Sequence, residues 1–418
     1  MNTTFRSLRG YNYRIWFAGG LVSNVGTWMQ RTAQDWLVLT ELTHNNATAV
    51  GIVMALQFGP QVLLLPWTGM ATDRLEQRKL LMATQAGMGV LALGLGLLTL
   101  AGWVQLWEVY LFALMLGCVS AFDSPARQTF VGQLVGETDL SNAVALNSTS
   151  FNAARMIGPA VAGVLIGTIG TGWVFMLNGL SFAAVLLSLT QLRAADLHPI
   201  RRAATASLRE GFQYVLGRPD LVTPLVMFGI LGTFGWNFPI FISTMAVSVF
   251  HVGASKFGLL TSMMAIGSVM GALSSAHRTR PHMGIVVWGA LAFGICCAVA
   301  AVMPSLGLFG MALMGMGLAA QTFSTSTNGL VQLSTEPAMR GRVMAILLAL
   351  AMGGTPIGAP MVGWVADHAS PRWALGVGAL AGLVATLFAL YRQSQLKRQS
   401  DGLHDPIDGQ DFARGGRG

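Results

Sequence analysis

The sequence predicts an all-α transmembrane protein in which twelve spans form two six-helix bundles. The first observation behind this prediction is composition: 53% of the 418 residues are hydrophobic and only 10% are charged, whereas a soluble domain carries roughly 25% charged residues. The second is that apolar stretches of about 20 residues, the length of one span, follow one another almost end to end. The third is that the basic residues fall in alternate loops.

Each span is predicted from one such apolar stretch. The first has the length of a span and carries charge within it, whereas the apolar core of a cleavable signal is shorter and uncharged. We therefore expect the first helix to be retained. Glu108 and Asp123, at opposite ends of the fourth span, are expected at the two membrane interfaces. The predicted spans are 15–40, 48–71, 80–102, 106–124, 142–168, 172–192, 221–248, 256–275, 284–303, 305–328, 343–366 and 373–392.

The loops on one side of the membrane carry nearly all the basic residues. Arg74, Arg78 and Lys79 follow the second span, for example, while the opposite loops hold only Lys256 and Arg372. The positive-inside rule then places both termini in the cytoplasm, which requires an even number of spans. The net charge of +8 follows from this loop pattern, so we expect membrane lipids around the protein and no nucleic-acid partner. The expected location is the bacterial inner (plasma) membrane.

The longest polar interruption divides the spans six and six. It separates an N-terminal bundle (1–192) from a C-terminal bundle (221–393) by a cytoplasmic central loop (193–220). Within this loop, 207–216 is expected to form an amphipathic helix on the inner membrane surface. Residues 394–418, which are polar and poor in apolar side chains, are expected to be a disordered tail.

The two halves also repeat a pattern. Gly163 and Trp173 match Gly363 and Trp373 at one spacing of 200 residues. Repeated halves of this kind are typical of transporter folds with a central binding site.

A glycine-acid-base motif follows the second span. Gly69 is followed four positions later by Asp73 and Arg74, and then by a basic cluster that includes Arg78. It resembles the signature loop of the major facilitator superfamily, departing from it at Glu76, where glycine is usual. The acid can accept hydrogen bonds from a helix N-terminus, so the loop is expected to act as a gating latch on the cytoplasmic face. Ordinary charge in an inside loop is the alternative interpretation.

Four further segments resemble one branch of that superfamily, which contains the enterobactin exporter and the macrolide efflux pumps. The resemblance covers roughly 5–395 and implies a transporter that works by alternating access. It is carried by Phe122–Gln128, Asn142–Asn147, Arg155–Pro159 and Arg209–Gly211.

The fifth span resembles the antiporter motif of drug exporters. Gly158 and Pro159 are followed by Gly163. Proline within a helix removes a backbone hydrogen bond, and glycines allow a neighbouring helix to approach closely. The motif is therefore expected to bend the helix, with a simple packing kink as the alternative.

A polar stripe in the first span supplies the candidate for proton coupling. Asn24, Trp28, Arg31 and Asp35 are spaced four, three and four apart, so they share one helix face. Ionisable groups within the membrane are costly and usually line the interior. Asp35 is therefore the proton-coupling candidate. A fixed pair with Arg31 and solvation at the outer interface remain alternatives.

The remaining cavity candidates come from the fifth and seventh spans. Asn152 and Arg155 share a face of the fifth span, where Arg155 is expected either to hold an anionic substrate or to neutralise an acid of the first span. In the seventh span Trp236, Asn237 and Pro239 predict a broken helix that faces the cavity.

Signatures of soluble enzymes are missing from the sequence. It contains no glycine-rich nucleotide loop with lysine, no zinc-protease motif and no nucleophile elbow. The three cysteines lie in apolar stretches and are expected to be buried hydrophobes. We therefore expect no enzyme activity, no cofactor, no metal site and no disulfide.

The function that these features predict is secondary transport. The protein is expected to export a small amphipathic compound (a drug, a siderophore or a similar metabolite) in exchange for protons, as a monomer. A lipid or lysophospholipid flippase, an importer of the same fold and a non-transporting membrane sensor are the alternatives.

Overall fold

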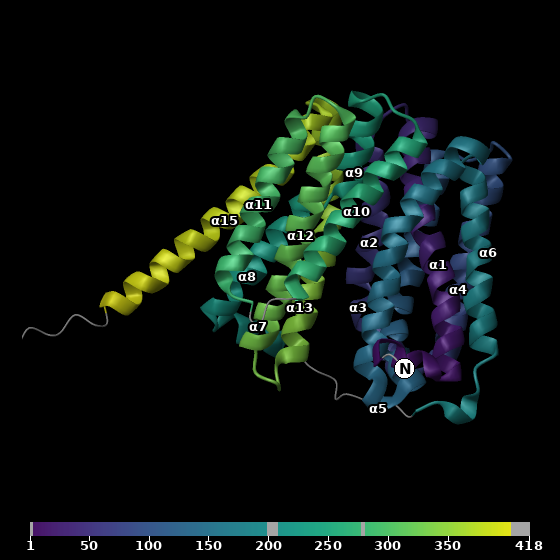
Figure 1. Cartoon of the computed structure of the whole chain (residues 1–418), viewed down its shortest axis with the longest axis horizontal. Helices are drawn as coiled ribbons and strands as arrows, with labels where there is room; N and C mark the ends of the chain where they lie inside the picture. The colour runs from purple at the N-terminus through teal and green to yellow at the C-terminus, as the bar shows by residue number, and fades with distance from the viewer. Residues whose placement is uncertain (1–2, 199–207, 277–280, 403–418) are drawn as a thin grey trace, which may run out of the picture.

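The computed structural model describes residues 3–198, 208–276 and 281–402, and within these ranges all regular structure is helical. The helices form two bundles that lie side by side (Figure 1). One bundle contains α1 to α6 and the other contains α8 to α15. This arrangement confirms the predicted all-α fold with two halves.

The first bundle begins with a short 3-10 helix, η1 (Thr3–Arg9), which packs against α5. A second 3-10 turn, η3 (Ala194–Asp196), follows the bundle. The spans of the first bundle are α1 (Tyr11–Trp36) with the π-helical turn η2 (Leu37–Leu42), α2 (Ala47–Leu63) with α3 (Leu65–Arg74), α4 (Gln77–Leu100), the two halves of α5 (Leu106–Ile169), and α6 (Thr171–Thr190).

The second bundle follows α7 (Leu208–Leu216), a helix that lies within the segment predicted to be amphipathic. The seventh span is built from four short pieces, and the eleventh from two. The elements are α8 (Pro219–Ile230), η4 (Leu231–Gly235), α9 (Phe238–Thr244), η5 (Met245–Val249), α10 (Ala254–Ala276), α11 (Met283–Val302), α12 (Leu306–Ser334), α13 (Arg340–Gly353), α14 (Thr355–His368) and α15 (Pro371–Gly402).

Ten helical segments of the described chain are long and apolar enough to cross a membrane, and the first two predicted spans fall outside this group. The first, α1, has 26 residues but carries Arg14, Arg31 and Asp35, which lower its hydropathy. The second is divided at Leu64, which leaves a 17-residue apolar helix and a separate α3. With these two, the helices account for the twelve predicted spans.

The connection between the fourth and fifth spans differs from the prediction. Instead of a loop over 125–141, α5 is helical on both sides of Gly136, the one residue inside it with non-helical dihedrals. Its φ of +67° is a conformation that glycine adopts without steric cost. A turn at one glycine allows both helices to continue well beyond their apolar segments.

This longer helix corrects the expected place of Asp123. The side chain is buried rather than interfacial, because the fourth span continues past it. Its carboxylate accepts hydrogen bonds from Thr84 Oγ1 at 2.8 Å and from Gln85 Nε2 at 2.7 Å. Arg127, one turn further along, pairs with it at 3.2 Å. Asp123 therefore joins the third and fourth spans within one bundle.

The C-terminal segment is also more helical than predicted. α15 continues to Gly402 and so includes the first residues of the segment predicted to be disordered, 394–402; the rest of that segment lies outside the described residues. Leucine, lysine, arginine and glutamine, which predominate after Ser394, are good helix formers. A long apolar helix can therefore continue through them.

The two bundles meet along two seams near the end of the molecule that lies away from the N-terminus, here called the distal end (Figure 1). One seam joins α2 to α14 and the other joins α5 to α10. Both use glycine for close approach. A Cβ on Gly363 would lie 2.5 Å from the carbonyl oxygen of Ala47, and one on Gly163 would lie 2.6 Å from that of Ala254. The two glycines paired by the repeat thus occupy equivalent places.

The α2–α14 seam carries an additional polar contact. Asp367, near the end of α14, accepts hydrogen bonds from the backbone N–H groups of Ala47 and Thr48, at 2.7 and 2.8 Å. The hydroxyl of Thr48 donates to the same carboxylate at 2.5 Å. A carboxylate from one bundle therefore caps the first turn of a helix in the other.

The α5–α10 seam uses hydroxyl groups instead. Ser255 Oγ donates to the carbonyl of Gly163 at 3.1 Å, and Ser262 Oγ donates to that of Met156 at 2.7 Å. Towards the middle of the molecule, Arg155 Nη2 lies 3.5 Å from Ser268 Oγ. The two serine contacts join neutral groups, the arginine makes one contact with a hydroxyl, and none of the three involves a carboxylate.

Candidate functional site

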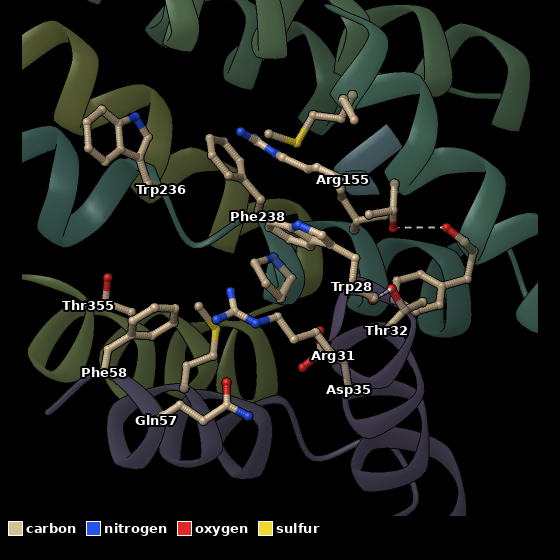
Figure 2. Close-up of a pocket in the computed structure, with 17 residues that line it drawn as sticks. Trp28, Arg31, Thr32, Asp35, Gln57, Phe58, Arg155, Trp236, Phe238 and Thr355 are labelled. Carbon is tan, nitrogen blue, oxygen red and sulfur yellow. Dashed lines mark hydrogen bonds between the residues drawn. The ribbon is translucent and has the colours of Figure 1, made fainter. Parts of the chain in front are cut away.

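A cavity of about 190 Å³ lies between the bundles, and both contribute to its wall (Figure 2). Most of the wall is apolar, with aromatic rings and methionines. From the first bundle the wall contains Trp28, Arg31, Thr32, Asp35, Met54, Gln57, Phe58 and Arg155, and from the second it contains Trp236, Phe238, Pro239, Ile242, Phe257, Thr261, Met264, Ala265 and Thr355.

The polar stripe of α1 reaches this cavity in part. Trp28, Arg31 and Asp35 line it together, as side chains at spacings of three and four should on a helical face. The neighbouring α5 approaches α1 closely because Gly158 has no Cβ, which would lie 2.6 Å from Trp28 Cβ. α5 continues as a helix through Pro159. The glycines of the predicted bend motif therefore set helix packing on both faces of α5.

Three ionisable side chains line the cavity: two arginines, Arg31 and Arg155, and one acid, Asp35. The guanidinium of Arg31 lies 5.2 Å from the centroid of the Trp28 ring, and that of Arg155 lies 5.8 Å from the same ring. Asp35 is one turn from Arg31 and attracts it electrostatically. In the described part of the chain, however, neither arginine forms an ion pair within 4.0 Å.

The seventh span brings an aromatic residue to the opposite wall. Its helix is interrupted between η4 and α9 at Trp236 and Asn237, as the sequence predicts. Trp236 lines the cavity, and its indole N–H is buried with no hydrogen-bond partner in the described residues. Asn237 is fully buried behind the wall and donates to the carbonyl of Thr233 at 2.9 Å. It braces the break in the helix.

Asn24 and Asn152 lie elsewhere. They line a second pocket of about 320 Å³ within the first bundle, together with Arg127. Trp28 lines the central cavity and Phe151 lines the second pocket, and their ring centroids are 5.6 Å apart. The two asparagines therefore lie beside the central cavity and not on its wall.

The predicted gating loop forms the end of α3 and the start of α4. Gly69 and Arg74 are exposed, and Arg78 donates to the carbonyls of Leu189 and Thr190 in the same bundle, at 2.8 and 3.1 Å. Arg78 thus caps α6 in this conformation. The side chain of Asp73 lies outside the described part of the chain, and the latch stays a prediction.

Several wall residues were missing from the sequence prediction. Gln57 and Phe58 come from the second span, and Thr261 and Met264 from the eighth. Gln57 was the detectable one, because an amide within an apolar span is unusual; its Nε2 donates to Gln34 at 3.1 Å. The others are apolar or weakly polar, so the sequence does not distinguish them from residues that face lipid or a neighbouring helix.

Metal-binding groups are not gathered in the described residues, where no three His, Cys, Asp or Glu side chains lie close enough to hold an ion. The three cysteines are free thiols. The site therefore offers cation–π contacts, one carboxylate and a large aromatic surface, which suit binding of an amphipathic molecule.

Comparison with known proteins agrees with this arrangement. Residues 2–407 match the model of the transmembrane secretion effector family. The enterobactin exporter of Citrobacter koseri is 27% identical over 85% of this chain and 86% of its own length. The staphyloferrin A transporter of Staphylococcus aureus is 25% identical over 85% of this chain and 89% of its own.

The fold is shared with solved transporters. A bacterial homologue of the human lysosomal transporter Spinster, solved in an inward-facing and unoccupied conformation, superposes with a TM-score of 0.73 at 15% identity. The alignment covers 93% of this chain and 98% of the other. The resemblance seen in the sequence is thereby confirmed: this chain is a multi-pass membrane transporter of the transmembrane secretion effector family, within the major facilitator superfamily.

Proposed function

We propose that the protein is a secondary exporter that moves a small amphipathic compound out of the cell in exchange for protons. One observation carries the proposal: a cavity between the two bundles holds both charged and aromatic side chains. Alternating access requires a central site of this kind between two halves. The relatives named above are described as siderophore exporters or transporters, which makes a siderophore-like compound the first substrate to test.

The proposal assigns the coupling proton to Asp35. This carboxylate lies on the cavity wall, where a proton can reach it from whichever side is open. It has no hydrogen bond or ion pair within 4.0 Å in the described residues. An acid without fixed partners is better suited to exchange protons than one such as Asp123, which three side chains hold.

The test uses purified protein in proteoliposomes with an acidic interior. We expect wild type to accumulate enterobactin or staphyloferrin A against its gradient. Asp35→Asn should lose this uphill uptake and keep exchange of labelled for unlabelled compound. Glu41→Gln, which removes an acid of the same span outside the cavity, serves as the matched control and should transport normally.

Two outcomes oppose the proposal in different ways. Full uphill uptake by Asp35→Asn removes Asp35 from the coupling mechanism. If Asp35 only neutralises Arg31, then Asp35→Asn should be poorly expressed or less heat-stable, and adding Arg31→Gln should restore both stability and uptake.

The proposed orientation places the bacterial inner membrane around the protein with both termini in the cytoplasm. Reporter fusions near positions 201 and 408 should then be cytoplasmic, and fusions at Asn45 and Gly253 should be external. An external signal at position 201 would overturn this topology.

A further inference from the structure

The ionisable groups on the wall of the central cavity do not balance. Arg31 and Arg155 carry two positive charges, whereas Asp35 carries at most one negative charge. The cavity therefore has an excess of at least one positive charge when it is empty. Because the surrounding wall is mostly apolar, little of this charge is screened by protein dipoles.

The contacts of Arg155 make the imbalance local. Its guanidinium meets the ring of Trp28 and the hydroxyl of Ser268, both of which are neutral. Its charged neighbour is Arg31, which repels it. Asp35 is one turn from Arg31 on the same helix, so the single acid of the cavity is placed to offset Arg31 and leaves Arg155 without a counter-charge.

A buried cation without a partner is costly, and an anion that pairs with it offsets the desolvation. Guanidinium groups are well shaped for this, because their N–H donors match the two oxygens of a carboxylate or a similar oxyanion. Figure 2 shows the ring of Trp28 between Arg31 and Arg155. The two guanidinium groups lie 5.2 and 5.8 Å from the centroid of this ring, so an anionic group at the edge of the ring is attracted by both charges.

We propose, building on the export function above, that Arg31 and Arg155 form a subsite for the anionic group of an aromatic organic acid. Trp28 lies between them as a platform. The rings of Phe58, Phe238 and Trp236 on the same wall supply the surface for an apolar or aromatic body. A cationic compound would meet two like charges here, so the site selects against it.

Asp35 then has a defined effect on the subsite. Its negative charge competes with the bound anion for Arg31, so removing that charge should strengthen anion binding. The anion and the proton therefore attract each other in the cavity. Proton exchange for an anion must consequently be enforced by the conformational cycle, and not by competition between the two for one site.

The experiment measures equilibrium binding of three probes that share a naphthalene ring and carry a small group of different charge: 1-naphthoate, neutral 1-naphthamide and cationic 1-naphthylmethylamine. Isothermal titration of the purified full-length protein in nanodiscs gives each affinity. We expect naphthoate to bind at least tenfold more tightly than the other two. Arg155→Gln and Arg31→Gln should each weaken naphthoate binding about tenfold or more and leave naphthamide binding unchanged.

Three variants act as controls. Arg155→Lys keeps the charge but not the paired N–H donors, and should lose less naphthoate affinity than Arg155→Gln does. Arg193→Gln removes an exposed arginine outside the cavity and should have no effect. Asp35→Asn should tighten naphthoate binding severalfold.

Equal affinity for naphthoate and naphthamide, or tighter binding of the amine, overturns the anion subsite. So does naphthoate affinity that survives both arginine substitutions. Naphthoate that binds as expected, in a protein that accumulates neither enterobactin nor staphyloferrin A in proteoliposomes, supports the subsite and contradicts the proposed export function. The two proposals can therefore fail separately.

Discussion

The two seams between the bundles have the same shape but different chemistry. Each has a glycine, Gly363 or Gly163, placed against a backbone carbonyl of the other bundle. At the α2–α14 seam, Asp367 also holds the first turn of α2 through three hydrogen bonds. At the α5–α10 seam, serine hydroxyls donate to backbone carbonyls instead.

The two seams therefore pack in the same way but differ in the strength of their hydrogen bonds. Hydrogen bonds to a charged acceptor are worth about 1.5–3 kcal/mol, roughly twice the value for neutral ones. Helix N-termini also favour a negative charge. The α2–α14 seam should therefore hold the distal end closed, while the α5–α10 seam, with weaker bonds, should allow the helices to slide or rock.

The largest effect is expected where shape alone is changed. Gly363→Leu and Gly163→Leu each place a side chain where backbone atoms of the other bundle already lie. Each variant therefore prevents its own seam from closing. We expect transport in proteoliposomes to fall at least tenfold for both, and spin labels across the distal end to move apart. Gly307→Leu, at a helical glycine with open space around it, should transport normally. Normal transport by either seam variant would mean that its seam need not close.

A smaller effect is expected from the carboxylate. Asp367→Asn keeps one acceptor oxygen and loses the charge, which should shift the balance from closed to open at the distal end by about 1–2 kcal/mol, or roughly five- to thirtyfold. Distances between spin labels at Asn45 and Ser370 measure the two populations. Asp196→Asn, at an exposed acid away from the seams, is the matched control. An unchanged distance distribution in Asp367→Asn would mean that the contact of Asp367 with α2 has no part in gating.

The smallest effect is expected from the hydroxyls of the other seam. Ser255→Ala and Ser262→Ala each lose one neutral hydrogen bond, worth about 0.5–1.5 kcal/mol. We expect each to change the open population less than Asp367→Asn does, with transport within about threefold of wild type. If either serine variant opens the distal end more than Asp367→Asn, the order of strength proposed for the seams is reversed.

Much of the fold was readable because hydropathy is a local property. The spans, the break at Trp236 and Asn237, and the helix over Leu208–Leu216 all follow from nearby residues. The shared face of Trp28, Arg31 and Asp35 follows in the same way, because helical spacing fixes it. The cavity confirms that these three side chains lie together, although the role of each stays a prediction.

The features that were missed depend on partners distant in sequence. Polar helix beyond the membrane, as around Gly136, has no hydropathy signal, and so Asp123 was placed at the end of a span that in fact continues. The contact between Asp367 and the start of α2 joins residues more than 300 positions apart. The contributions of Phe58 and Met264 were equally hidden, since packing alone decides which apolar face of a span meets the cavity.

The charge of the cavity has an electrical consequence. Moving one elementary charge through a membrane potential of 100 mV is worth about 2.3 kcal/mol. If an anion leaves as a proton enters, both movements carry positive charge inward, and an inside-negative potential drives them together. Each cycle would then draw about 4.6 kcal/mol per 100 mV from voltage, beyond any contribution from the pH difference. A protein with two arginines and one acid in its central cavity would thus be an electrogenic carrier, and a current across a planar bilayer that reverses with potential should reveal it.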